Sequence, residues 1–249
     1  MKLIFKPILK YYLKFIAKLV LLIHRPIVIA VSGSINKYFF REEIKRVLEK
    51  NGFRVGPNKR SFNTEIGLPL AILNLGSGYN SYRGWIPVMK QAFLSIFKKD
   101  FSDVLVLELG VSAPGDMKYL LSIVKPKIAI ITDITQRHLE SFSDMDNLSS
   151  EYELLARENT KGGLAILNYD NIRLRGIVKE NKGNVETFGF SGGSNWQAKE
   201  TVKKTSGQKF KIVHGEKITE NEIDRFGQHH ILAFLAGKII EDNLRIIKK

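Results

Sequence analysis

The stretch that decides the fold is Ile27-Val28-Ile29-Ala30-Val31-Ser32-Gly33-Ser34-Ile35-Asn36-Lys37-Tyr38. It opens with five consecutive apolar residues, as expected of a central parallel strand that is buried on both faces. A glycine turn, a lysine and a helical pattern over Tyr38–Asn51 follow. This order is typical of a P-loop-type segment, which holds phosphate groups with backbone N–H donors and a lysine. We therefore predict a nucleotide-binding loop whose residues are Gly33, Ser34, Asn36 and Lys37.

Two positions in this loop depart from the usual pattern. The residue before the lysine is normally Gly, and here it is Asn36, whose side chain would crowd the phosphate path. Asn nevertheless tolerates the left-handed backbone conformation better than most residues. The residue after the lysine is normally Ser or Thr, whose hydroxyl binds Mg²⁺, but a phenol at Tyr38 is too long for that role. We expect weak binding of Mg·ATP, roughly micromolar to millimolar.

Apolar runs typical of buried strands alternate with segments of helical period along the rest of the chain. Strands are predicted at Val104–Leu109, Ile128–Ile131, Leu164–Leu167 and Val185–Phe188. Helices are predicted at Leu68–Leu75, Trp85–Phe97, Asp116–Val124, Glu151–Asn159 and Ile172–Asn181. The alternation predicts an α/β fold, a three-layer, doubly wound, mostly parallel sheet with helices on both faces.

The carboxyl-terminal part departs from this alternation. The polar segment Ser191–Gly207 predicts a loop, and a short hairpin is expected near Lys209–Val213. A last helix is predicted from Gly227 to about Glu241. Ligands of doubly wound sheets bind beyond the carboxyl ends of the strands, which is where Gly33 and Glu108 are expected.

The amino-terminal segment, residues 1–25, has a different character from residues 26–249. Lys6, Lys10, Lys14 and Lys18 are spaced by four, which places them along one side of a helix that is otherwise largely apolar. Interleaved lysines fit neither a secretory signal nor a spanning helix. Two alternatives stay open: a basic amphipathic helix that lies on an anionic membrane surface, or a helix that packs on its own domain or on a partner.

Composition narrows the function classes. The 249 residues carry a net charge of +14, and residues 1–41 contain eight basic residues and no acid. Nucleic acid is not expected as a partner, because no recognition motif or interleaved aromatic and basic patch accompanies the charge. The chain has no cysteine, which excludes disulfides and thiolate metal sites and fits a cytoplasmic protein, with peripheral attachment at the inner face of the membrane if the first alternative holds.

Several short motifs occur in the order found in one family. The chain resembles the central ATPase domain of the Mur ligases, most closely the type that adds D-alanyl-D-alanine to the muramoyl tripeptide. The matching segments are the loop 32–37, Asn63–Leu70, Glu108–Gly110 with Pro114–Asp116, His138–Glu140, Ala165–Asp170 and Gly227–His229. The resemblance implies a Mur-ligase central-domain-like fold and the cofactors ATP and Mg²⁺. It also implies a family chemistry in which ATP activates a carboxylate that an amine then attacks.

The resemblance also assigns roles to single residues. It matches Lys37 to the phosphate-loop lysine, and Glu108 and His138 to metal-site residues. Glu151 matches a lysine that is carbamoylated in the family, and its side chain would supply a permanent carboxylate at that position. His230 stands where the family has an Asn at the adenine.

The family's usual amino- and carboxyl-terminal domains have no counterpart in the resemblance. A protein partner is therefore expected to supply them if any ligase activity occurs. The alternative is a catalytically inactive scaffold or regulator of cell-wall synthesis at the membrane surface.

Overall fold

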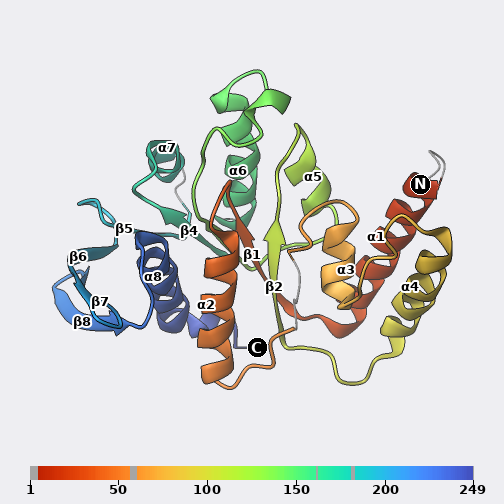
Figure 1. Ribbon diagram of the computed structural model, residues 1–249, viewed down its shortest axis with the longest axis horizontal. Coiled ribbons are helices and arrows are strands. Elements are labelled where there is room, and N and C mark those ends of the chain that lie inside the picture. Colours follow the sequence, from red (N-terminus) through yellow and green to blue (C-terminus); the bar gives the residue numbers. More distant parts are fainter. Residues whose placement is uncertain (1–4, 57–60, 161, 181–182, 249) are drawn as a thin grey trace.

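The computed structural model describes residues 5–56, 61–160, 162–180 and 183–248. They form an eight-stranded sheet with the strand order β2-β1-β3-β4-β5-β6-β7-β8 (Figure 1). The strands are β1 (Ile27–Ser32), β2 (Val104–Leu109), β3 (Ile128–Ile131), β4 (Leu164–Asn168), β5 (Val185–Gly189), β6 (Trp196–Lys204), β7 (Gly207–His214) and β8 (Lys217–Ile223). Pairing is parallel from β2 across to β6 and antiparallel from β6 to β8.

Helices cover both faces of the sheet. On one face lie α2 (Lys37–Lys50) and α8 (Gln228–Asp242). On the other lie α3 (Gly67–Leu73), α5 (Asp116–Leu121), α6 (Met145–Thr160) and α7 (Ile172–Glu180). The apolar strand residues alternate between the two layers, since Val28 and Ala30 face one and Ile29 and Val31 the other. The predicted three-layer, doubly wound fold is confirmed.

The amino-terminal helix α1 (Phe5–His24) packs on its own domain. Its side chains Leu9, Leu13 and Val20 are buried in a third cluster with α3 and α4 (Tyr82–Leu94), and Figure 1 shows α1 and α4 beyond α3, at the end of the molecule away from β8. The lysine side of α1 is largely occupied within the protein. Lys6 pairs with Glu65 at 3.2 Å, while Lys10 and Lys14 lie over the Tyr119 ring at 4.0 and 4.5 Å from its centroid. No helix among the described residues is long and apolar enough to cross a membrane.

The predicted loop over Ser191–Gly207 is wrong, because most of it forms β6. Most of this strand is exposed, so it lacks the apolar alternation that identifies a half-buried strand. It forms through backbone pairing with β7 instead, with an irregular register between Lys199 and Val202. Among the helices, α6 begins at Met145, ahead of its predicted start, and three short 3₁₀ turns occur at Ser95–Phe97, Leu139–Ser141 and Leu244–Ile246.

Candidate functional site

The carboxyl ends of β1, β2 and β3 meet at one edge of the sheet, where Ser32 is in register with both Leu109 and Ile131. The loops that follow these strands enclose a cavity of about 360 Å³, called here the loop cavity. Residues from the predicted site line it together: Gly33, Ser34, Asn36, Lys37, Glu108 and His138. Sequence segments that are far apart therefore converge at the position expected for a ligand of a doubly wound sheet.

The glycine turn is set by close packing of the backbone. Gly33 has φ 131°, and a Cβ at this position would lie 2.2 Å from Oγ1 of Thr132. Ser34 is buried, donates its N–H to the Asp133 carbonyl at 2.8 Å, and accepts the Thr135 N–H on Oγ at 3.0 Å. These hydrogen bonds connect the loop to the segment after β3, so Ser34 stabilises the conformation of the loop.

Asn36 takes the left-handed conformation that its residue type allows, with φ 64° and ψ 1°. It directly precedes α2, and its side chain makes no capping hydrogen bond to the helix. The Asn36 side chain therefore leaves the start of α2 uncapped, and in the first turn the Phe39 N–H donates to the Asn36 carbonyl at 3.0 Å.

Lys37 is folded back onto its own loop. Its Nζ donates a hydrogen bond to the carbonyl of Gly33, and the side chain is half-buried. Burial lowers the pKa of Lys37; Glu108 acts in the opposite direction, and the positive charge of Arg137 lowers the pKa further.

Glu108 forms a buried ion pair that the sequence did not reveal. Nη1 of Arg41 donates to Oε1 of Glu108 at 2.7 Å, and both side chains are less than 5% exposed. Ser61 donates to the same carboxylate oxygen at 3.1 Å. The spacing places Arg41 one turn after Lys37 on the same side of α2, but it does not identify Glu108 as its partner. The guanidinium also lies 5.1 Å from the centroid of the Tyr38 ring.

The other predicted metal-site residues differ in position. His138 lines the loop cavity, with Nδ1 at 3.9 Å from the carboxylate of the exposed Glu140. Glu151 does not line it: its two oxygens accept the N–H groups of Gly115 and Met117 at 2.7 and 2.8 Å, at the start of α5. Within the described residues, no cluster of three or more His, Cys, Asp or Glu is arranged for a metal. The metal-ligand roles of these residues remain predictions.

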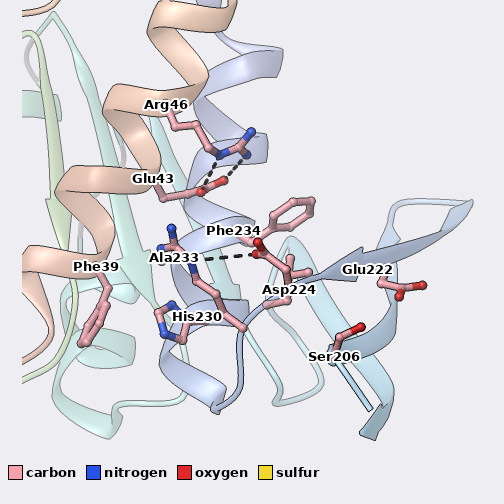
Figure 2. A pocket seen from close by; sticks show the side chains of 11 residues that line it. Phe39, Glu43, Arg46, Ser206, Glu222, Asp224, His230, Ala233 and Phe234 are labelled. Atoms are coloured by element: carbon pink, nitrogen blue, oxygen red, sulfur yellow. Dashed lines mark hydrogen bonds and ion pairs between the residues drawn. The ribbon is translucent and has the colours of Figure 1, made fainter. Parts of the chain in front are cut away.

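His230 lies in a different cavity, of about 580 Å³, between α2, α8 and the end of β8, called here the helix cavity (Figure 2). The Phe39 ring stands 4.8 Å from the His230 ring and 4.4 Å from the His229 ring, measured between centroids. Burial lowers the pKa of His230, and the nearby His229 and Arg225 lower it further. Phe39 follows Lys37 and Tyr38 directly, so the first turn of α2 contributes to both cavities.

Comparison with known proteins identifies a matching family and several relatives. The model of the Mur ligase middle domain matches residues 87–240. The UDP-N-acetylmuramoyl-tripeptide–D-alanyl-D-alanine ligase of Rickettsia prowazekii is 27% identical over 190 residues, or 75% of this chain and 36% of the relative. The ligase of the same name from Buchnera aphidicola is 26% identical over 228 residues, or 88% of this chain and 43% of the relative.

Solved structures show the same fold. The MurF ligase from Thermotoga maritima, in complex with ADP, superposes with a TM-score of 0.75 at 20% identity, over 95% of this chain and 49% of that one. MurF from Acinetobacter baumannii gives a TM-score of 0.72 at 18% identity, over 96% and 48%. The chain thus spans less than half the length of each of these four relatives.

Proposed function

Because this chain belongs to the Mur ligase family, through its middle domain, we propose that it binds Mg·ATP across the loop cavity and the helix cavity. The observation that carries the proposal is the convergence of Gly33, Lys37, Glu108 and His138 on one cavity at the carboxyl edge of the sheet. The phosphates occupy the loop cavity and the adenine lies beside Phe39 and His230. The ADP complex named for the Thermotoga maritima relative supports this ligand class.

The charges of the loop cavity suit a polyphosphate. Lys37 and Arg137 both line it, while the charge of Glu108 is balanced by Arg41. The cavity therefore has an excess of positive charge at the start of a helix, a combination that favours anions. Glu108 and His138 would hold Mg²⁺ only together with phosphate oxygens and water, because two protein groups are too few for an octahedral ion.

In the cell the chain would act in peptidoglycan precursor metabolism, as the names of its relatives suggest. Their reaction type, joining a carboxylate to an amine with ATP, needs binding surfaces for both substrates. The middle-domain region alone matches less than half of those relatives. We therefore propose that any ligase activity needs, besides this middle-domain region, the further regions that these relatives possess.

Titration calorimetry with Mg·ATP tests the nucleotide proposal. The wild type should bind with roughly micromolar-to-millimolar affinity, and Lys37→Ala should weaken binding at least about tenfold because it removes the buried cation. Lys50→Ala, at the other end of α2, is the matched control and should bind like the wild type. No binding by the wild type, or equal affinities for all three proteins, would refute the proposal.

A second candidate function is that of an inactive relative that regulates cell-wall synthesis. The bonds inside the loop favour this second function. Lys37 donates to the Gly33 carbonyl and Arg41 pairs with Glu108, so both candidate ligand-binding groups already have partners within the protein. Repair of the loop separates the two functions. If the loop sequence limits binding, Asn36→Gly with Tyr38→Thr should tighten Mg·ATP binding about tenfold, whereas an unchanged, undetectable affinity would favour the inactive relative.

A further inference from the structure

An exposed apolar surface lies on α1 and α4, away from both cavities. Most of the large apolar side chains that are exposed among the described residues belong to α1 or to the segment 79–97. We name their core the α1–α4 face: Ile8, Phe15 and Leu22 on α1, and Ile86, Phe93 and Phe97 on α4 and the 3₁₀ turn after it. These six side chains are between 51% and 67% exposed. Concentrated exposure of this kind marks an interaction surface.

The α1 part of this face lies next to α4. Phe5 of α1 meets the Tyr82 ring, with centroids 4.9 Å apart, and the Tyr12 hydroxyl donates to the Met89 carbonyl at 2.9 Å. Ile8 and Phe15 follow Phe5 and Tyr12 by three residues, which is about 60° short of a full turn, so they lie to one side of the contact residues. The buried side of α1, with Leu9 and Leu13, lies in the opposite direction from this contact.

The α4 part is arranged in the same way. Ile86 and Phe93 follow the two α1-contacting residues, Tyr82 and Met89, by four positions, or about 40° around the helix. The buried residues of α4, Trp85 and Ala92, lie on the other side of the contact. Both exposed rows therefore lie on the outer side of the same helix–helix contact.

The charged residues within the two stretches that contain the face are all basic. The sequence has no acidic residue in 1–41 or in 66–99, the two stretches that contain the face. Exposed cations border it: Lys18 on α1, and Arg83, Lys90, Lys98 and Lys99 around α4. An apolar surface with a mainly basic border complements an anionic lipid surface, where apolar side chains enter the interface and cations meet the headgroups. A second copy of the chain would instead bring like charges together.

We propose that the α1–α4 face docks the domain peripherally on an anionic phospholipid bilayer. The inserted side chains are those of both helices, with α1 held by its buried side on the domain. This differs from a free amphipathic helix, because most of the lysine side of α1 contacts Glu65 and Tyr119. Lys18, at the end of that side, stays exposed beside the face. The membrane contact is then a property of the folded domain and does not depend on nucleotide.

Co-sedimentation of the whole chain with vesicles tests this proposal. Vesicles of phosphatidylcholine and phosphatidylglycerol in equal parts should bind the protein, pure phosphatidylcholine should bind it weakly, and about 0.5 M salt should reduce the binding. Each half-exposed Phe that enters the interface contributes about tenfold in affinity, so Phe93→Ser with Phe97→Ser should weaken binding about 100-fold. Ile8→Ser with Phe15→Ser should have a similar effect.

Matched controls distinguish docking through the α1–α4 face from non-specific hydrophobic adsorption and from unfolding. Ile172→Ser with Ile218→Ser changes two side chains that are 73% and 64% exposed outside the face, and it should bind vesicles like the wild type. Lys18→Glu with Lys90→Glu should abolish the preference for anionic lipid while the thermal unfolding temperature is unchanged. The proposal is overturned if the wild type ignores anionic vesicles, or if the control loses binding as much as the face variants. A dimer that the face variants dissociate, without vesicle binding by the wild type, would likewise overturn it and assign the face to a second copy.

Discussion

The loop cavity and the helix cavity both use the first turn of α2, yet they are built differently. The loop cavity is polar, and its charged side chains are bonded within the protein: Lys37 donates to the Gly33 carbonyl, and Glu108 pairs with Arg41. The helix cavity is larger and is bordered by aromatic rings, with Phe39 against His230. The difference indicates that phosphate groups must compete with bonds inside the protein to bind in the loop cavity. The adenine ring would enter a helix cavity that is already open.

The buried pair in the loop cavity gives the largest predicted effect. Arg41→Met should reduce the free energy of unfolding by about 3–5 kcal/mol, because it leaves the buried Glu108 without its counter-charge. Denaturant unfolding measures this. Lys45→Met, which removes an exposed pair with Glu49 at 3.7 Å, is the control and should cost at most about 0.5 kcal/mol. Equal losses in the two variants would show that Glu108 does not depend on Arg41.

The glycine turn gives the next effect. Gly33→Ala should destabilise by roughly 2–3 kcal/mol, because the added Cβ meets Thr132 in addition to the strain of a positive φ. Gly115→Ala shares a positive φ, 87°, but its Cβ would meet nothing within 4 Å, so it should cost only about 1 kcal/mol. If the two variants unfold at the same denaturant concentration, close packing does not shape the loop cavity.

The smallest predicted effect tests whether one cavity binds the adenine and the other binds the phosphates. His230→Ala should weaken ATP binding about fivefold, since it removes an aromatic contact at the adenine, but should leave the binding of inorganic tripolyphosphate unchanged. Lys37→Ala should weaken both ligands. Competition titrations with the two ligands measure the difference, and a His230 variant that loses both ligands equally would contradict separate adenine and phosphate cavities.

The fold was predictable from the sequence because the central strands are buried on both faces. Each therefore appears as a continuous apolar run, such as Ile27–Val31, without the polar positions of a surface strand or helix. Strand β6 was not, because its exposed residues are ordered by backbone pairing that side-chain periodicity does not record. The convergence of Lys37, Glu108 and His138 followed from their positions at strand ends and from the family resemblance.

Two features of the candidate site needed the three-dimensional structure. The pairing of Arg41 with Glu108 joins residues 67 positions apart, and local spacing cannot specify such a partner. The position of His230 in a separate cavity depends on how α8 packs against α2, which the motif around it does not contain.

The most direct test of the central claim is the titration of the Lys37 ammonium group by ¹⁵N NMR, with and without saturating ADP. In the free protein its pKa should lie below the ordinary lysine value, because burial and Arg137 disfavour the charged form. Phosphate oxygens favour the charged form, so ADP should raise that pKa. A Lys37 titration that does not move while ADP is bound would contradict the assignment of the loop cavity to phosphate.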